Sequence, residues 1–165
     1  MIGGGDWASD RLVPDCFRAF EAGEPVRLRL PDARRPFQHV LGPLAGYLVL
    51  AERLLGDGGE RFARAWNFGP DPAEVATVSE VAERLANLWG GGARIERGTD
   101  GGWAETETLR LDNRRARAEL GWTTPWSLEQ ALEQTVVWER AWLRGEDMQA
   151  VSEHQIAQYV GAVSR

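Results

Sequence analysis

Apolar residues recur every three or four positions in several stretches of the chain, a spacing typical of amphipathic helices. Two of these stretches open with a capping-box pattern, Thr77-x-x-Glu80 and Ser127-x-x-Gln130. We therefore predict helices over about residues 10–22, 41–55, 78–89, 128–144 and 152–162. The second has an apolar face of Leu41, Leu44, Ala45, Leu48 and Ala51, and the fourth has one of Leu128, Ala131, Leu132, Thr135, Val136, Trp138, Trp142 and Leu143.

Short strands are predicted between these helices. Residues 25–30 alternate strictly, with Val26 and Leu28 on one face and Arg27 and Arg29 on the other. Residues 65–70 and 108–111 favour two more brief strands, and Asp112 is placed to cap a short helix that ends at Gly121. The pattern indicates an α+β fold, mostly helical with short strands, forming one domain over residues 1–165 that leans as a lobe on a larger sheet.

A glycine turn stands at the start of the chain. Gly3, Gly4 and Gly5 are typical of a tight turn that follows a strand and lets a ligand approach the backbone. We expect that strand to be missing from this chain. A Gly-x-Gly-x-x-Gly fingerprint is not present, so the sequence predicts no dinucleotide-phosphate site of its own.

Charge and composition exclude several classes of function. The net charge of −6 and the pI near 5.0 argue against broad nucleic-acid binding, which needs a basic face. The longest apolar run, residues 44–51, is far shorter than a membrane span. One cysteine, Cys16, cannot form an internal disulfide, and no export signal is recognised, so a cytoplasmic protein is expected.

All 19 basic residues are arginine, and the chain has no lysine. Schiff-base chemistry needs an amine that can lose its proton, and a phosphate-binding loop of the Gly-Lys type needs an ammonium group. Neither can be carried by this chain. Cys16, His39 and His154 have no metal-ligand spacing, and we expect structural roles for both histidines.

The most concentrated chemical signal is a group of arginines within nine residues. Arg27 and Arg29 lie on the predicted strand, and Arg34 and Arg35 lie in the loop expected after it. Guanidinium groups suit a diphosphate, but a solvated strand face with salt bridges fits the same pattern. Among the eight tryptophans most are expected in the core, while Trp7, beside the glycine turn, is a candidate pocket wall.

Several motifs, taken together in this order, resemble the CDP-glucose 4,6-dehydratase family of extended short-chain dehydrogenases. They are Ile2-Gly3-Gly4-Gly5-Asp6-Trp7-Ala8-x-Asp10-Arg11-Leu12-Val13-Pro14-Asp15, Arg35-Pro36-Phe37-Gln38-His39-Val40, Ala65-Trp66-Asn67-Phe68-Gly69-Pro70, Leu120-Gly121-Trp122 and Gly145-x-Asp147-Met148. The resemblance covers essentially the whole chain and is to the C-terminal, substrate-binding half of such enzymes. It implies a Rossmann-type α/β fold when the protein is complete.

By this resemblance, the complete enzyme uses NAD to oxidise glucose at C4, eliminates water across C5 and C6, and returns the hydride to C6. The family's Tyr-x-x-x-Lys motif and NAD fingerprint lie before the glycine turn. The chain alone is therefore expected to bind no NAD and to be inactive. The implied partners are CDP-glucose or a related nucleotide sugar and an N-terminal Rossmann half, missing or separate. A homodimer or an aggregate is expected if apolar surface that packs on that half is exposed.

What the resemblance carries to single residues is nucleotide-sugar binding. It implies that Gly3, Gly4 and Gly5 approach the diphosphate, that Arg11 and Leu12 line the nucleotide entrance, and that Arg35 contacts the diphosphate. Arg29 and His39 also match substrate-binding positions; no residue of this chain matches a catalytic or metal position. The chain departs from the family pattern at residues 104–106 and in the helix after Asp112, where an arginine replaces a lysine.

Three functions stay open at this point. The chain is the substrate-binding portion of a CDP-glucose 4,6-dehydratase, or a non-catalytic nucleotide-sugar-binding module completed by a separate Rossmann chain. The third is the corresponding part of another NAD-dependent nucleotide-sugar epimerase or dehydratase.

Overall fold

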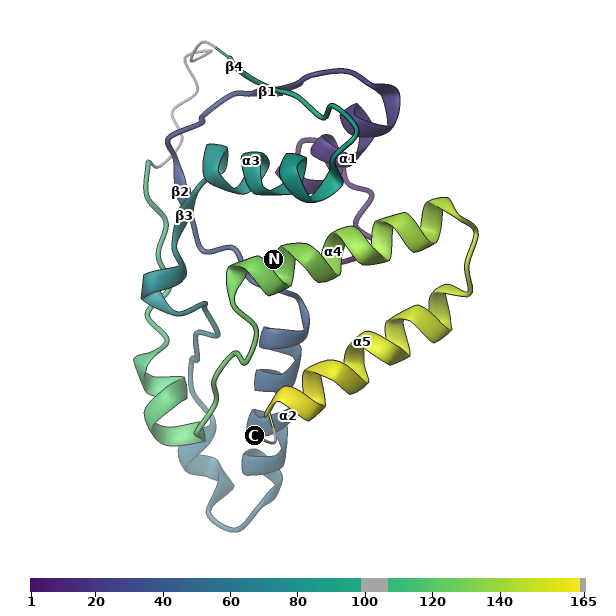
Figure 1. Ribbon diagram of the computed structural model, residues 1–165. Helices are drawn as coiled ribbons and strands as arrows, with labels where there is room; N and C mark the ends of the chain where they lie inside the picture. The colour runs from purple at the N-terminus through teal and green to yellow at the C-terminus, as the bar shows by residue number, and fades with distance from the viewer. Residues whose placement is uncertain (99–106, 164–165) are drawn as a thin grey trace.

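The computed structural model describes residues 1–98 and 107–163 (Figure 1). The helices are α1 (Leu12–Ala22), α2 (Leu41–Leu55), α3 (Val78–Trp89), α4 (Leu128–Leu143) and α5 (Met148–Val163). The strands are β1 (Val26–Leu28), β2 (Arg34–Arg35), β3 (Ala76–Thr77) and β4 (Ile95–Arg97). Short helical turns are η1 (Gly59–Phe62), η2 (Pro72–Glu74) and η3 (Ala116–Leu120). The described residues are thus mostly helical with short strands, as predicted.

Both predicted capping boxes are present. Thr77 Oγ1 accepts from the Glu80 N–H at 3.1 Å, while the Thr77 N–H donates to Glu80 Oε2 at 2.7 Å. Ser127 and Gln130 make the same reciprocal pair at the start of α4. Each pair satisfies two backbone donors that a helix start would leave unbonded, which explains why these two helix starts were readable from local sequence.

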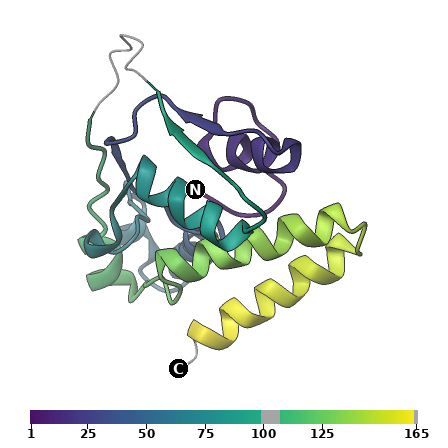
Figure 2. The ribbon, with the colours of Figure 1, turned by 45° about the horizontal axis from the view of Figure 1, so that its top comes forward.

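Helix α5 begins four residues earlier than predicted. The Asp147 carboxylate accepts hydrogen bonds from the Gln149 and Ala150 N–H groups, so Asp147 caps the helix where the apolar pattern gave no start signal. After a turn at Gly145, which has a φ of +69°, α5 runs back along α4 (Figure 2). The indole N–H of Trp138 on α4 donates to Ser152 Oγ on α5 at 3.1 Å.

The strands form two small pairs. β1 pairs with β4 in parallel, with Val26 opposite Ile95, and β2 pairs with β3 in antiparallel register. The short strands β2, β3 and β4 were not predicted. Arg34 and Arg35 were expected in a loop but lie in β2. A strand of two residues is too short to show the alternation of side chains from which a strand is predicted.

Two predicted strands are wrong. Residues 65–70 form none: the Phe68 carbonyl accepts from Gln38 Nε2 at 2.6 Å and the Gly69 carbonyl from Asn113 Nδ2 at 2.9 Å. Side-chain amides therefore donate to backbone carbonyls that would accept hydrogen bonds from a neighbouring strand in a sheet. Over residues 108–111 only Thr108 makes an isolated bridge, with Arg34. The predicted helix after Asp112 is present, with the Asp112 carboxylate accepting from the Arg114 N–H at 3.0 Å.

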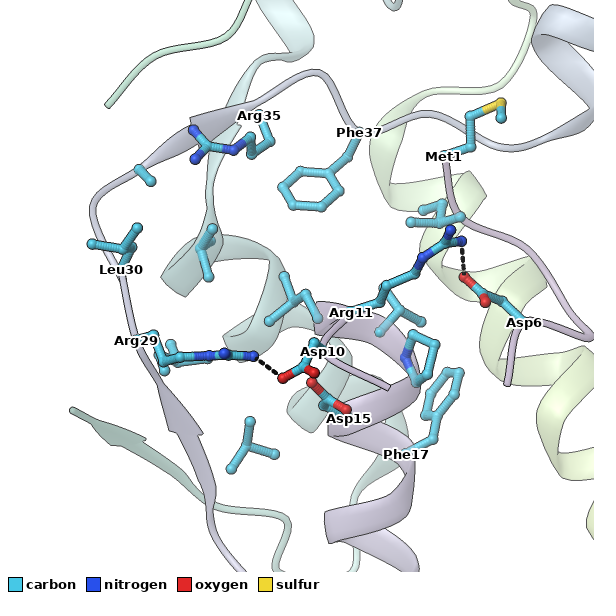
Figure 3. Close-up of a pocket in the computed structure, with 18 of the residues that line it drawn as sticks. Met1, Asp6, Asp10, Arg11, Asp15, Phe17, Arg29, Leu30, Arg35 and Phe37 are labelled. Carbon is cyan, nitrogen blue, oxygen red and sulfur yellow. Dashed lines mark hydrogen bonds and ion pairs between the residues drawn. The ribbon is translucent and has the colours of Figure 1, made fainter. Parts of the chain in front are cut away.

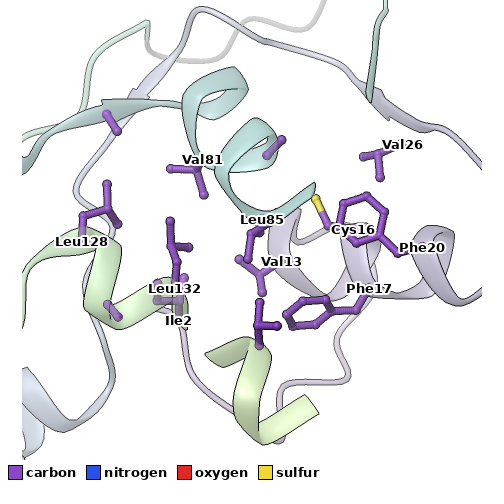
Figure 4. Close-up of a cluster of buried hydrophobic side chains, with 14 of the residues drawn as sticks. Ile2, Val13, Cys16, Phe17, Phe20, Val26, Val81, Leu85, Leu128 and Leu132 are labelled. Carbon is purple, nitrogen blue, oxygen red and sulfur yellow. The ribbon is translucent and has the colours of Figure 1, made fainter. Parts of the chain in front are cut away.

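The main core lies between α1, α3, α4 and β1 (Figure 4). Val81 and Leu85 of α3 and Leu132 of α4 are completely buried, and Val26 and Leu28 of β1 close the cluster. A second, smaller cluster joins α2 to the η3 region through Phe62, Phe68, Ala116, Leu120 and Trp122. Most of the predicted apolar faces are therefore buried. The apolar face of α4 is buried as far as Trp138, whereas Trp142 and Leu143 after it are about half exposed.

Helix α2 is the exception to this agreement. It lies away from the layer of α1 and α3 (Figure 1). Its fully buried residues are Gly42, Pro43 and Gly46, and Val49 and Leu50 are only partly buried against the second cluster. Leu44 and Leu48, which the periodicity placed on a buried face, are 46% and 73% exposed. The spacing of apolar residues identifies an apolar face on a helix, but it does not show whether another element covers that face.

Gly46 gives a first prediction. A Cβ there would lie 2.4 Å from Phe68 Cδ1, so we expect Gly46→Ala to destabilise the protein by about 1–2 kcal/mol even though alanine favours helices. Gly161→Ala in α5, where a Cβ meets nothing within 4 Å, is the matched control and should stabilise slightly. Urea unfolding of both variants checks this, and equal stabilisation by both would contradict it.

Candidate functional site

A cavity of about 710 Å³ lies between the start of the chain, the first turn of α1 and the segment that runs from β1 to β2 (Figure 3). Val78 at the start of α3 and Glu139 on α4 also contribute to its wall. Because α1, α3 and α4 share the main core, these contributions from distant parts of the sequence are held together by packing.

The first turn of α1 offers free backbone donors to this cavity. Its N-cap is Arg11, in extended conformation and with no side-chain cap. The Asp15 N–H bonds back to the Arg11 carbonyl, whereas the Leu12 and Val13 N–H groups find no acceptor among the described residues. Unbonded N–H groups and the helix dipole together attract anions.

Arginine side chains reach the cavity from three sides (Figure 3). Arg11 is paired with Asp6 at 3.0 Å, and Arg29 with Asp10 at 2.6 Å. Such exposed ion pairs contribute little to stability, so an arriving phosphate can compete for them at small cost.

Arg35 lies on β2 at the opposite wall from α1 (Figure 3). Its Nη1 donates to its neighbour's carbonyl, that of Arg34, at 2.9 Å and to the Glu107 carbonyl at 3.4 Å. The alternative interpretation of the arginine cluster was a strand face with surface salt bridges. Arg27 makes such a salt bridge, with Glu96 at 3.4 Å. Both Arg27 and Arg29 nevertheless line the cavity, so each fits the salt-bridge and the ligand interpretation.

Apolar side chains complete the wall. They include Leu12, Val13, Leu28, Leu30, Phe37 and Val78. The lining also contains the carboxylates Asp6, Asp10, Asp15 and Glu139, and the first two are ion-paired with Arg11 and Arg29. A cavity with arginines that can exchange such partners and with an apolar wall suits a ligand that has an anionic part and a flat, weakly polar part. A nucleotide diphosphate has this composition.

The glycine turn is divided between two roles. Gly3 lines the cavity. Gly4 does not: it lies against the indole of Trp138, where a Cβ would come within 1.9 Å of the ring. Gly5 has a φ of +76° and also lies outside the lining. Packing and backbone conformation thus explain these two glycines without a ligand.

His39 lies outside this cavity. It is 5% exposed, its Nδ1 accepts from the Leu41 N–H at 3.3 Å, and its ring packs edge-on against Trp126. Burial lowers the pKa of His39 to about 4, so the imidazole is neutral at pH 7.

Trp7 was a candidate pocket wall, and the structure places it elsewhere. It is 53% exposed, and its ring lies beside those of Trp138 and Trp142 with centroid distances of 6.1 and 5.2 Å. Of the sequence-based site residues, the cavity therefore brings together Gly3, Arg11, Leu12, Arg29 and Arg35. Residues 104–106, where the chain departs from the family pattern, lie outside the described residues.

Glu139 is a cavity residue that sequence reasoning missed. It is 5% exposed, and burial, with the nearby Glu21 carboxylate, raises its pKa to about 7. The signal was available, because position 139 follows Leu132 by seven and Thr135 by four residues and so lies on the apolar face of α4. A glutamate on an apolar helix face is unusual, because burying its carboxylate is costly unless a partner binds it.

Known proteins were compared with the chain. No family model matches it. Over all 165 residues it is 42% identical to the CDP-glucose 4,6-dehydratase of Salmonella typhimurium, and it spans 46% of that protein's length. The chain matches part of a CDP-glucose 4,6-dehydratase. The resemblance drawn from the sequence motifs is thereby confirmed.

Several solved structures share the fold. The dTDP-glucose 4,6-dehydratase of Bacillus anthracis, solved with NAD, is 21% identical with a TM-score of 0.61, over 79% of this chain and 39% of that one. The RMD protein of Pseudomonas aeruginosa, solved with NADPH, is 20% identical with a TM-score of 0.66, over 82% and 44%. A UDP-galactose 4-epimerase is 13% identical with a TM-score of 0.58, over 81% and 40%. The predicted fold class, a lobe of an extended short-chain dehydrogenase, is confirmed.

Two further searches concern the described residues only. None of their helices combines the length and the apolar content needed to cross a membrane. Nor do their His, Cys, Asp and Glu side chains gather in groups of three that could hold a metal ion.

Proposed function

We propose that this chain is the nucleotide-sugar-binding portion of a CDP-glucose 4,6-dehydratase. The observation that carries the proposal is the cavity, whose lining includes Arg11 at the start of α1, Arg29 after β1 and Arg35 on β2, beside the unbonded N–H groups of the first turn of α1. Among the anionic molecules that such a cavity suits, the 42% identity to a CDP-glucose 4,6-dehydratase favours a nucleotide sugar.

The cavity residues divide the ligand between them in this proposal. Arg35 and the N–H groups of the first turn of α1 hold the diphosphate, with Arg11 and Arg29 exchanging their aspartate partners for phosphate oxygens. The apolar wall covers the pyrimidine. The backbone of Gly3, which lines the cavity without a side chain, allows the ligand to approach closely.

NAD does not fit these residues. Binding its diphosphate in the usual way requires a glycine fingerprint between a strand and a helix, and the 165 residues contain no Gly-x-Gly-x-x-Gly. They also contain no lysine for a Tyr-x-x-x-Lys motif. We propose that a Rossmann portion outside these residues supplies NAD and the catalytic groups, and that the chain alone binds the nucleotide sugar without converting it.

The exposed apolar face of α2 supports a partner of this kind. Leu44, Tyr47, Leu48 and Leu55 are between 46% and 90% exposed along one helix. Exposed apolar side chains that share one helix face are typical of a contact with another domain or chain, and we propose that the Rossmann portion covers this face. Co-purification with a separate polypeptide that carries that portion favours the two-chain alternative. Self-association of the isolated chain through α2 gives a homodimer.

Binding is the direct test. Isothermal titration of the purified chain should show saturable binding of CDP-glucose that exceeds that of UDP-, GDP- and dTDP-glucose. Equal affinity for all four would remove the CDP assignment and leave another nucleotide-sugar enzyme. Incubation with CDP-glucose and NAD should yield no CDP-4-keto-6-deoxyglucose on chromatography, and its formation would overturn the proposed division of labour.

A further inference from the structure

The wall of the cavity formed by α4 contains a single acidic side chain, Glu139. Its side chain makes no hydrogen bond or ion pair with any residue in the described ranges 1–98 and 107–163. At 5% exposure it is buried by well over nine-tenths. A carboxylate with so little solvent contact and no partner is poorly satisfied, and its place in the cavity wall puts it within reach of a donor on a bound ligand.

The surroundings of Glu139 do not neutralise it. Arg140, the next residue, turns its guanidinium to the carbonyls of Leu88 and Trp89 at the end of α3. The nearby charge that acts on the Glu139 carboxyl is another acid, Glu21 of α1. A carboxylate in this setting repels phosphate and favours a neutral N–H or O–H donor.

This separates the cavity into two chemical regions. Near α1, the lining carboxylates Asp6, Asp10 and Asp15 are each ion-paired with an arginine, and Arg11, Arg29 and Arg35 favour the diphosphate. The α4 wall holds the Glu139 carboxylate, unpaired among the described residues, and favours a hydrogen-bond donor that carries no negative charge. A pyrimidine nucleotide offers two such donors: the exocyclic amine of cytosine and the hydroxyls of ribose. Uracil and thymine present a carbonyl at the position of that amine, which a carboxylate rejects.

We propose that the Glu139 carboxylate accepts a hydrogen bond from the bound nucleotide, either from the cytosine amine or from a ribose hydroxyl, and so selects the ligand. The inference rests on the proposed function and adds to it a residue that determines specificity. Charge-assisted hydrogen bonds donated to a desolvated carboxylate are among the stronger polar contacts that a site can make.

The test is calorimetric titration of CDP, UDP and 2′-deoxy-CDP into the parent chain, Glu139→Gln and Glu133→Gln at pH 8. Glu133 lies exposed on the same helix, so its variant controls for the lost charge. We expect Glu139→Gln to weaken CDP binding about tenfold, with Glu133→Gln unchanged. Loss of the CDP over UDP preference identifies the amine as the donor, and loss of the CDP over deoxy-CDP preference identifies the ribose hydroxyl.

Equal binding of all three ligands by Glu139→Gln and the parent would overturn the proposal while leaving the proposed function intact. Failure of the parent to bind CDP at all would overturn both. Thermal unfolding of each variant accompanies the titrations, because a purely structural role would change stability and leave the ligand preferences unaltered.

Discussion

Arg35→Ala is expected to weaken CDP binding by roughly ten- to a hundredfold, the largest loss among the cavity arginines. Hydrogen bonds between a guanidinium and a diphosphate are charge-assisted, and a net contribution of about 1.5–3 kcal/mol corresponds to roughly ten- to a hundredfold in affinity. Arg35 lies on β2, opposite the free N–H groups of α1, so a diphosphate between them is held from both sides.

The matched control is Arg34→Ala on the same short strand. Its side chain does not line the cavity, and its backbone, which pairs with Thr77 and with residues 107–109, stays unchanged in the variant. Calorimetric titration of CDP into the parent and both variants measures the effect. Equal losses in the two variants would show that only the general positive field matters and would contradict a specific contact by Arg35.

Above pH 7, Glu139→Gln is expected to stabilise the protein by roughly 2–3 kcal/mol. The pKa of Glu139 is raised from 4.5 to about 7 in the folded protein, mainly by burial. Below pH 4.5 the carboxyl is protonated in both the folded and the unfolded state, and the parent carries no penalty. As pH rises from 4.5 to 7 the unfolded state ionises first, and the full penalty of about 3 kcal/mol is reached above pH 7. The amide of the variant is neutral at every pH and so avoids this ionisation penalty, although its own burial without a partner offsets part of the gain.

Urea unfolding at pH 4.5 and pH 8 measures this difference. The gain should be present at pH 8 and small at pH 4.5, and Glu133→Gln should show no such pH dependence because its side chain is exposed. A gain of the same size at both pH values would mean that ionisation of Glu139 is not its cause. A variant that gains stability while it loses CDP affinity separates the two roles of this residue.

Helix starts and stops were predictable from local sequence because their determinants are a few residues apart. The Thr77 and Ser127 capping boxes act within one helical turn, and glycines with positive φ, such as Gly23 and Gly145, end helices by their own conformational freedom. The strands were less predictable. β2 and β3 have two residues each, and what makes them strands is pairing between segments about forty positions apart.

The candidate site was predictable in part. Arg11, Leu12, Arg29 and Arg35 were named from motifs, and the fold brings them together with Gly3 around one cavity. Gly4 and His39 belong to the same motifs but pack against Trp138 and Trp126. A motif records that residue types recur together, and it does not separate those that face a ligand from those that support the backbone behind it.

The sequence by itself determined the helices, their caps, the absence of lysine and the likeness to one class of nucleotide-sugar dehydratase. These depend on residues that are neighbours in the chain or on identity position by position. Only the tertiary structure decided which faces are buried. It left the apolar stripe of α2 exposed, because Gly42 and Gly46 allow the helix to pack on its opposite side, and it buried Glu139 in the cavity wall. Burial depends on what lies across from a side chain, and that neighbour comes from a distant part of the sequence.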